Sequence, residues 1–312
     1  MKQARGEATA FSPASVGNVA VGYDLLGHVI EGLGDRVMVR RTERTTVIIE
    51  SITGTVTDLP LDADSNTAGR AVQSLLEATS AAFGITLSIE KGIPLSSGLG
   101  GSAASATAAV VAVNALLERP LAPEQLYPHA LVGEAVASGS VHGDNVGPQL
   151  LGGLVLATPQ RLVSVPVPSG LHVAVVHPDF RIDTRDARQV LDRPFSIETI
   201  VAQQTRLSLV LAGCFRNDLE MIREGLSDVL VEPHRARLIP GFDDVKHAAL
   251  AGGALGASIS GAGPSVFAWF DSRPTAEAAA IRMAQAFASH DLKATPYVSA
   301  VGAPGARLVE NE

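Results

Sequence analysis

The sequence predicts an α+β protein made of two domains. Short segments rich in β-branched residues and bounded by glycine are typical of strands, and longer segments carry apolar residues at helical spacing. This mixture of strands and helices favours α+β layers. Prolines cluster in residues 158–168, so we predict an N-terminal domain over residues 1–165 and a C-terminal domain over residues 166–312.

The N-terminal half has the clearest patterns. Apolar side chains form one stripe along residues 67–83, which predicts a helix, and residues 85–90 alternate between apolar and polar side chains, as a half-buried strand does. An Ala-rich helix follows a Gly/Ser turn and ends before Pro120, because proline cannot continue a helix. The predicted elements in chain order are strands 36–41 and 45–50, helix 67–83, strand 85–90, the Ala-rich helix from about residue 102, and helix 123–137.

The C-terminal half shows the same two kinds of pattern. A glycine-rich segment at 252–263 precedes residues 264–270, whose aromatic and β-branched side chains predict a strand. The other predicted elements are strands 152–157 and 171–177, helices 196–213, 215–231 and 274–289, and a last strand at 294–301.

Composition excludes several classes of protein. The net charge is −8 and the sequence has no basic stripe, so we expect no nucleic-acid partner. The longest apolar stretch, 103–117, is shorter than the roughly 20 residues that span a bilayer, so we expect no membrane partner. The polar start shows no secretory signal, which predicts a cytoplasmic protein. The single cysteine, Cys214, is expected to be buried.

The most informative segment is the Gly/Ser turn at 94–105, between a predicted strand and the Ala-rich helix. Its glycines, Gly98, Gly100 and Gly101, allow positive φ angles and a close approach of the backbone to a ligand. The helix that follows presents unpaired N–H groups and the positive end of its dipole, which together favour a phosphate. A plain helix-capping turn is the alternative.

Two better-known phosphate motifs do not fit this turn. The Walker A loop requires a lysine that is absent here. The dinucleotide fingerprint matches at Gly98, Gly100 and Ala103, and Glu118 stands where its ribose-binding acid would be expected. Glu118, however, ends the same helical run instead of following the next strand, which argues against that interpretation.

Three segments together resemble the GHMP kinases, namely residues 13–27, 94–105 and 258–265, in the order that is typical of that family. The resemblance implies a two-domain α+β fold with ATP and substrate in the cleft between the domains. It also implies that residues from about 294 to 312 pack back on the first domain, and it allows for a homodimer. Segments 142–148, 184–188 and 232–241 are most similar to the branch that phosphorylates L-homoserine, a step in threonine biosynthesis.

The resemblance implies a binding site for ATP and Mg²⁺. Ser102 and Glu134 match the two metal ligands of the family, although Glu134 read alone would suggest a solvated helix face. The residues that match the family's nucleotide site are Asn66, Pro94, Leu95, Ser96, Ser97, Gly98, Leu99, Gly100, Gly101, Ser102, Ala103 and Ala104.

The resemblance also implies a substrate site. The matching residues are Asn18, Asp24, His142, Arg188, Arg235 and Gly261. Asn145 and Arg188 are the expected catalytic residues, and Arg188 and Arg235 would bind the substrate carboxylate. Asn145 stands where mevalonate-kinase-like relatives use an aspartate as base, which predicts catalysis without a strong protein base, although Asp144 is adjacent. Read alone, Asn18 and Asp24 are typical of turns, and the arginines of a surface.

The sequence departs from the family pattern at two positions, and three other functions are alternatives. Gly101 stands where the family often has serine, and Tyr23 where it often has phenylalanine. The first alternative is a kinase of the same family that acts on a sugar or an isoprenoid acid. The second is a non-catalytic ATP-binding member, against which intact Ser102 and Glu134 argue. A nicotinamide-binding protein is a more distant third.

Overall fold

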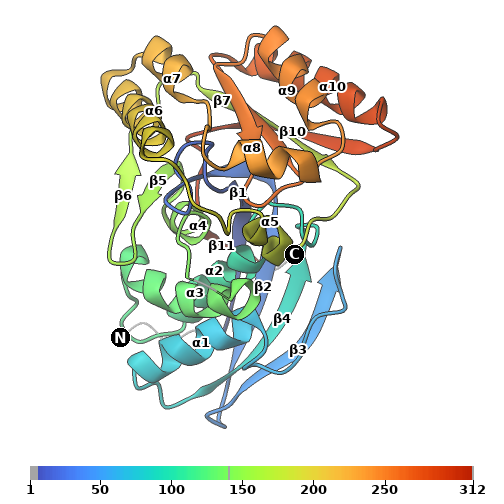
Figure 1. Ribbon diagram of the computed structural model, residues 1–312. Helices are drawn as coiled ribbons and strands as arrows, with labels where there is room; N and C mark the ends of the chain where they lie inside the picture. Colours follow the sequence, from blue (N-terminus) through green and yellow to red (C-terminus); the bar gives the residue numbers. More distant parts are fainter. Residues whose placement is uncertain (1–5, 140, 311–312) are drawn as a thin grey trace.

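Two β-sheets, one above the other in Figure 1, organise the computed structural model, which describes residues 6–139 and 141–310. In the described residues, the first sheet has seven strands in the order β11-β1-β2-β4-β3, with β5 paired to β2 and β6 to β5. Its strands are β1 (Glu7–Val16), β2 (Leu26–Thr42), β3 (Val47–Gly54), β4 (Gly84–Lys91), β5 (Leu154–Ala157), β6 (Leu162–Val165) and β11 (Arg307–Val309). All pairs are antiparallel except β3 with β4.

Four helices accompany the first sheet: α1 (Thr67–Ala78), α2 (Gly101–Asn114), α3 (Pro123–Ser138) and α4 (Val146–Leu151). Helix α2 is apolar on nearly all sides, because it packs against β1 and β2 as well as against α1 and α3. It is therefore the central helix of this domain, and its buried residues begin at Ala103, just after its N-terminus.

The second sheet, uppermost in Figure 1, has the order β10-β7-β9-β8, all antiparallel. Its strands are β7 (His172–Pro178), β8 (Gly256–Ile259), β9 (Val266–Phe270) and β10 (Ala294–Ala300). The remaining helices are α5 (Thr184–Gln189), α6 (Ile197–Arg216), α7 (Leu219–Gly225), α8 (Glu232–Arg235), the 3₁₀ helix η1 (Ala236–Leu238), α9 (Phe242–Ala251) and α10 (Arg273–Ala288). Helices α9 and α10 share an apolar core with one face of this sheet.

A second apolar core joins the two sheets. It brings Leu26 and Ile30 of β2 together with Phe267 and Trp269 of β9, and it includes the buried Cys214 of α6. The expected burial of that cysteine is confirmed. Because one continuous core spans both sheets, their relative position is set by packing, and not by a linker alone.

Most predicted elements are present, and the differences have local causes. The predicted helix 215–231 is wrong: α6 ends at Arg216, the left-handed residue Asn217 caps it, and the separate helix α7 follows. The glycine-rich segment 252–263 contains strand β8. The elements that the prediction missed include β1, β6, β11, α4, α5, α8 and α9. Within the segment expected to return to the first domain, β10 pairs with β7 in the second sheet, and β11 pairs with β1 in the first. The boundary at 165/166 stays a prediction.

Within the described part of the chain, none of the helices combines the length and the apolar character needed to cross a bilayer.

Candidate active site

The glycine-rich turn joins β4 to α2, as the sequence predicts, but in a largely antiparallel sheet. Gly98 and Gly100 have φ angles of +75° and +67°, which confirms the expectation of positive φ at both residues. Gly101 is the first residue of α2 and does not share that conformation. Gly100 precedes the helix without a side-chain cap, so the N–H groups of the first turn remain directed at the space in front of α2.

The close approach that the structure shows at Gly98 and Gly100 is to neighbouring protein segments, and their approach to a ligand stays a prediction. A Cβ on Gly98 would lie 2.8 Å from the carbonyl oxygen of Gly263, and one on Gly100 would lie 2.8 Å from Oδ1 of Asn145. Both glycines are therefore required by neighbouring protein segments. The same junction is tied by Ser260 Oγ, which donates to the Gly98 carbonyl over 2.7 Å.

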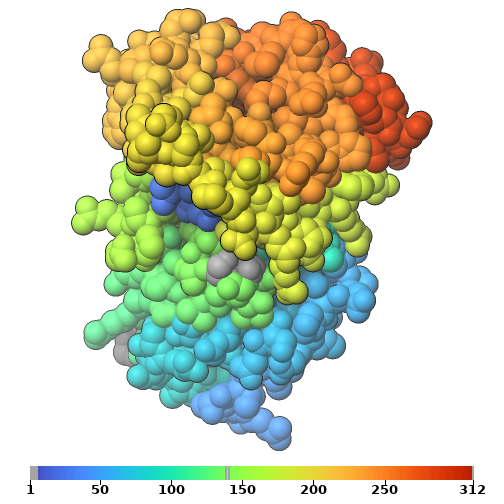
Figure 2. Space-filling model, in the orientation of Figure 1, coloured from blue at the N-terminus to red at the C-terminus, as the bar shows by residue number. Residues whose placement is uncertain are grey.

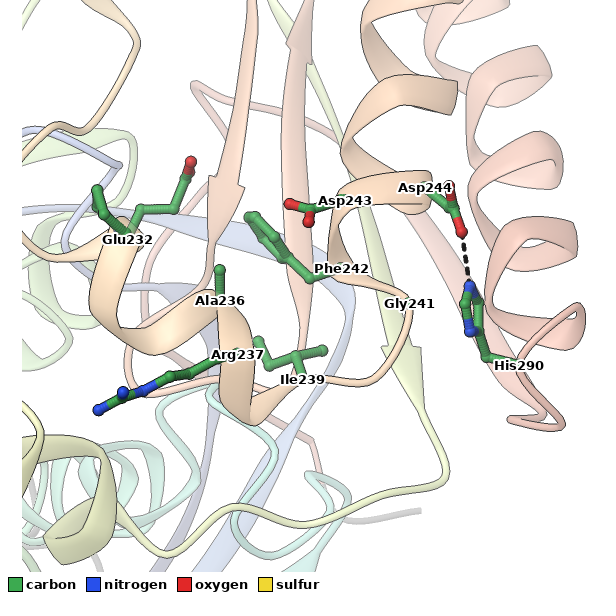
Figure 3. Close-up of a pocket in the computed structure, with 10 residues that line it drawn as sticks. Glu232, Ala236, Arg237, Ile239, Gly241, Phe242, Asp243, Asp244 and His290 are labelled. Carbon is green, nitrogen blue, oxygen red and sulfur yellow. Dashed lines mark hydrogen bonds and ion pairs between the residues drawn. The ribbon is translucent and has the colours of Figure 1, made fainter.

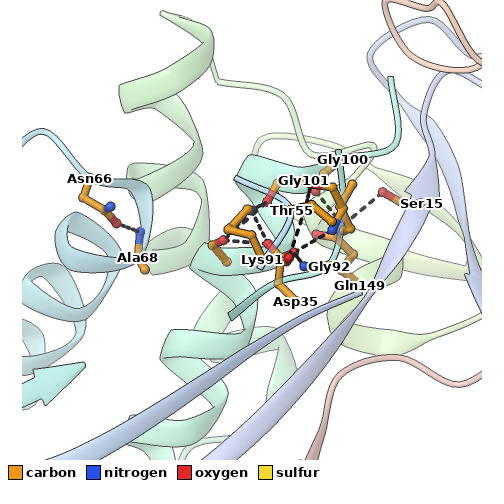
Figure 4. Close-up of polar contacts among 12 residues, drawn as sticks. Ser15, Asp35, Thr55, Asn66, Ala68, Lys91, Gly92, Gly100, Gly101 and Gln149 are labelled. Carbon is orange, nitrogen blue, oxygen red and sulfur yellow. Dashed lines mark hydrogen bonds and ion pairs between the residues drawn. The ribbon is translucent and has the colours of Figure 1, made fainter. Parts of the chain in front are cut away.

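The first of the three resembling segments also reaches the turn. The backbone N–H of Ser15 donates to the carbonyl of Leu99 over 3.1 Å, and Gln149 of α4 donates to the Gly100 carbonyl over 3.0 Å (Figure 4). The turn is thus held from both domains.

A buried ion pair lies beneath the turn (Figure 4). Lys91, the last residue of β4, pairs with Asp35 of β2 and donates to the Gly101 carbonyl over 2.7 Å and to Ser105 Oγ over 2.8 Å. Asp35 Oδ1 in turn accepts from the backbone N–H of Gly92 over 3.0 Å. Sequence reasoning missed this pair, and the only available signal was a lysine that ends a strand just before the turn.

The two residues expected to bind metal come together. Ser102 is in the first turn of α2, and its side chain hydrogen-bonds the Glu134 carboxylate from α3. The pKa of Glu134 is raised to about 7, mainly by burial and also by the charge of Asp144, while the bond to Ser102 and the charge of Lys91 oppose the shift. The set offers oxygen atoms only, which is the chemistry that Mg²⁺ prefers, and so the residues fit this ion.

The loop between β1 and β2 builds the opposite wall. Asn18 and Asp24 have positive φ angles of +67° and +58°, a conformation that these residue types tolerate. The backbone N–H of Asn18 donates to Asp144 Oδ2 over 2.9 Å, its side-chain amide donates to the Gly261 carbonyl over 2.8 Å, and its Oδ1 accepts from the N–H of Asp24 over 2.9 Å. Asn18 therefore joins the first and third of the resembling segments to the region of Asp144.

The two predicted arginines meet at this wall. Arg188 of α5 makes a bidentate pair with Asp24, over 3.1 and 3.3 Å. Arg235 of α8 is 3% exposed and donates through Nε to the Ala187 carbonyl over 2.8 Å and through Nη1 to the Gly261 carbonyl over 3.0 Å. Arg188 and Arg235 both also donate to the hydroxyl of Tyr23.

His142 lies 3.2 Å from Asp24, measured from Nδ1 to Oδ2. Burial lowers its pKa, and Arg188 acts in the same direction, while Asp24 opposes them. The histidine is thus held neutral at neutral pH and belongs to the group of polar side chains around Asp24.

Asp144 and Asn145 lie between the group around Asp24 and the glycine turn. Asn145 begins α4 and accepts a hydrogen bond from Ser15 Oγ over 2.8 Å. Asp144 is 3% exposed, and burial, followed by the charge of Asp24, raises its pKa to about 7. The sequence analysis gave the site to Asn145 and left Asp144 as its neighbour, but the structure brings both into it.

Asn66 is the predicted residue that stays apart. It caps α1, where its Oδ1 accepts from the N–H groups of Ala68 over 2.9 Å and Gly69 over 3.3 Å. Figure 4 draws it away from the group around Gly100.

The surface also carries a hollow of about 620 Å³, away from the residues described above (Figure 3). Its lining comes from α8, η1, the start of α9 and His290, and none of the predicted site residues is among it. Exposed acidic and basic side chains alternate around it, and His290 is already paired with Asp244 over 2.7 Å. Polar groups converge around the glycine turn and Asp24 and not around this hollow, so we place the candidate active site there.

Comparison with known proteins agrees with this fold and site. The family model described as GHMP kinases N terminal domain matches residues 66–153, and the one described as GHMP kinases C terminal matches residues 210–289. The chain belongs to the GHMP kinases, a family that uses ATP. The resemblance seen in the sequence, the α+β fold of two domains and the prediction of a kinase are thereby confirmed.

The individual relatives have more specific names than the family. The homoserine kinase of Xanthomonas campestris pv. campestris is 57% identical over 308 residues, 98% of this chain and 96% of that protein. The crystal structure of homoserine kinase from Cytophaga hutchinsonii has a TM-score of 0.95 at 40% identity and covers 99% of both chains. A galactokinase from Lactococcus lactis shares the fold with a TM-score of 0.70 at 15% identity, over 98% of this chain and 96% of that one.

Proposed function

We propose that this chain transfers the γ-phosphoryl group of ATP to the hydroxyl of L-homoserine and forms O-phospho-L-homoserine. The observation that carries the proposal is the meeting of Asp24, Arg188 and Arg235 beside the glycine turn. Homoserine carries an ammonium, a carboxylate and a hydroxyl, and this site offers an acid, two guanidinium groups and a phosphate-binding turn. The names of the relatives support the same substrate.

On the nucleotide side, the N-terminus of α2 supplies N–H groups and a partial positive charge for the phosphates of ATP. Ser102 and Glu134 would hold Mg²⁺, which neutralises charge on the phosphates during transfer. Across residues 6–139 and 141–310 no cluster of three metal-binding side chains gathers. Two protein ligands are sufficient here, because Mg²⁺ is commonly bound by one or two side chains together with the phosphates of the nucleotide.

On the substrate side, Arg188 and Arg235 would bind the carboxylate, since a guanidinium group matches the geometry of two carboxylate oxygens. Asp24 and Asn18 would receive the ammonium group, with His142 beside them. Arg188 already contacts Asp24, so the arginine is held in position before the substrate arrives.

The chemical step requires one bond to form and one to break. The homoserine oxygen attacks the γ-phosphorus, the bond to the β-phosphate oxygen breaks, and ADP leaves. Asn145 cannot accept the hydroxyl proton, and its Oδ1 is engaged by Ser15. We therefore propose that the proton leaves through the transferred phosphate or water, and that Asn145 orients the hydroxyl. Positioning and charge neutralisation are the main requirements of such a transfer.

The test is a coupled assay of ADP release with L-homoserine, mevalonate and galactose. We expect turnover with homoserine that exceeds turnover with either other acceptor by at least ~10³-fold, because a site built for charged groups rejects analogues that leave them unpaired. Preference for another acceptor would overturn the substrate, and ATP binding without turnover of any acceptor would favour the non-catalytic alternative. The cytoplasmic location and a homodimer stay predictions.

A further inference from the structure

Tyr23 lies between the two arginines. Its hydroxyl oxygen accepts a hydrogen bond from Nη1 of Arg188 over 3.0 Å and another from Nη2 of Arg235 over 3.3 Å. Its ring also lies below both guanidinium groups, with centroid distances of 5.8 Å for Arg188 and 5.2 Å for Arg235. The three residues come from the β1–β2 loop, α5 and α8, so one side chain connects arginines from two separate helices.

The phenol has one more hydrogen bond to give. Its oxygen accepts twice, and its own O–H can donate once. Among the described residues that O–H reaches no acceptor, although the side chain is only partly exposed. Burial and the charge of Asp24 raise the pKa of Tyr23, while the two arginines oppose them, so the group remains a neutral donor at neutral pH.

Arg188 supplies a second donor without an acceptor. Its Nε is buried and bonds none of the described residues. The Tyr23 hydroxyl and Arg188 Nε are therefore two donors beside the guanidinium groups that the described residues leave unused. A carboxylate accepts from several donors and is favoured by adjacent positive charge.

We propose that Tyr23 is a specificity-determining residue, whose hydroxyl aligns Arg188 and Arg235 and donates its hydrogen to the carboxylate of the substrate. The inference rests on the proposed function, because it names a further contact to the carboxylate of the same amino acid. It predicts that the enzyme distinguishes a carboxylate from a neutral group through three side chains, not two.

The test removes the hydroxyl alone. Tyr23→Phe keeps the ring and its contacts with the guanidinium groups, and Tyr297→Phe, on the outer strand β10, serves as the matched control. We expect Tyr23→Phe to raise KM for L-homoserine about 5- to 20-fold, with kcat and KM for ATP changed less than about twofold. Tyr297→Phe should leave all three at the wild-type values.

A second substrate separates recognition from structure. L-homoserinamide has a neutral amide in place of the carboxylate, so its kcat/KM should be low in the wild type and change less than about twofold in Tyr23→Phe. The double variant Tyr23→Phe/Arg235→Ala should lose less than the product of the two single losses, because the residues share one acceptor.

The outcomes are distinguishable. An unchanged KM for homoserine in Tyr23→Phe overturns the inference and leaves the proposed function intact. An equal loss with homoserine and its amide also overturns it, since it would mean that the hydroxyl only holds the loop in place. If the wild type does not phosphorylate homoserine at all, the proposed function fails, and the inference fails with it.

Discussion

At the scale of single residues, the site depends on charges that the fold keeps out of water. Glu134 is the clearest case, because burial is the largest of the influences that together raise the pKa of its carboxyl to about 7. A divalent cation would reverse that shift, since it favours the ionised form. The carboxylate is therefore well suited to a site that is filled only when the nucleotide arrives with its metal.

The first prediction concerns that carboxylate. Glu134→Gln keeps the size of the side chain and removes its charge, so we expect kcat to fall by ~10²-fold or more. Glu77→Gln on the exposed side of α1 is the matched control and should retain wild-type kcat. The measurement is steady-state kinetics with saturating Mg²⁺-ATP, together with a thermal melt. A folded Glu134→Gln enzyme with near-normal turnover would contradict the metal role.

The second prediction concerns the arginines. Arg188→Ala and Arg235→Ala should each raise KM for homoserine roughly 10- to 150-fold, since each loses a charge-assisted contact, and should leave KM for ATP nearly unchanged. Lysine at either position should restore little of the binding of homoserine, because its ammonium group lacks the planar fork of a guanidinium. Arg185→Ala, on the exposed side of α5, is the control.

The two variants should differ in stability. Arg235 is buried, and its loss removes the donor to the Ala187 carbonyl and one of the two donors to the Gly261 carbonyl, whereas Arg188 is partly exposed. We therefore expect a lower melting temperature for Arg235→Ala than for Arg188→Ala. Wild-type KM for homoserine in both variants would mean that the carboxylate binds elsewhere.

At the scale of elements, the glycine turn is a junction between domains. Its conformation is supported by Ser260 from the second domain and by Ser15 and Gln149 from the first. A change in the turn is thus transmitted to both domains. The geometry before α2 depends on these contacts as much as on the glycines.

The third prediction separates two costs of replacing a glycine. Gly98 and Gly32 both have positive φ, +75° and +80°, but a Cβ on Gly32 meets nothing within 4 Å, whereas one on Gly98 meets the backbone of the 260–263 segment. Gly32→Ala should cost about 1–2 kcal/mol of unfolding free energy, from the conformation alone. Gly98→Ala should cost more, because the two segments must also separate.

Nucleotide binding gives the second readout. Gly98→Ala should weaken ATP binding at least ~10-fold by calorimetry, since displacing the turn misdirects the N–H groups of α2. A Cβ on Gly32 meets no atom within 4 Å, so Gly32→Ala should not displace the turn and should bind ATP as the wild type does. Equal stability and equal ATP affinity in the two variants would contradict the claim that the glycine turn depends on its contact with the 260–263 segment.

At the scale of the whole molecule, one buried hydrogen bond joins the two sheets within their shared core. Nε1 of Trp269 in β9 donates to Nε2 of His28 in β2 over 3.0 Å. Because an indole N–H can only donate, Nδ1 of His28 carries the ring hydrogen and donates to the Val29 carbonyl over 3.0 Å. Protonation of Nε2 would remove the bond between the sheets.

The fourth prediction follows from that arrangement. Burial lowers the pKa of His28 to about 4, from about 6.5 in an unfolded chain. The neutral form is favoured in the fold, so its contribution is complete above pH 6.5 and is lost as the pH falls toward 4. The unfolding free energy should change with pH with a slope that corresponds to about one proton. The total loss of unfolding free energy over this pH range should be about 3 kcal/mol.

Urea unfolding between pH 7.5 and 4.5 measures this loss. The wild type should lose more stability with acid than His28→Gln, in which the titrating group is absent, and His247→Gln on the exposed side of α9 should behave as the wild type does. Parallel pH profiles for the wild type and His28→Gln would contradict the role of His28.

Local patterns in the sequence predicted what depends on neighbours in the chain. The positive φ angles of Gly98 and Gly100 follow from residue type, and the Ala-rich helix follows from composition, although α2 ends at Asn114, before the chain reaches Pro120. The helix predicted at 215–231 failed because the chain reverses at Asn217, a residue that tolerates a left-handed conformation and that apolar spacing does not reveal.

By itself, the sequence determined the class of fold, the phosphate turn and, through its resemblance to a family, the residues expected at the site. Only the tertiary structure decided which of them meet. Asn18 reaches Gly261 across 243 positions of the chain, and Tyr23 reaches Arg235 across 212. The pair of Lys91 with Asp35 has no pattern in the sequence at all, because its partners lie on adjacent strands whose pairing places them together. Such contacts depend on how the two sheets pack around their common core, and residue type and local spacing carry no record of that packing.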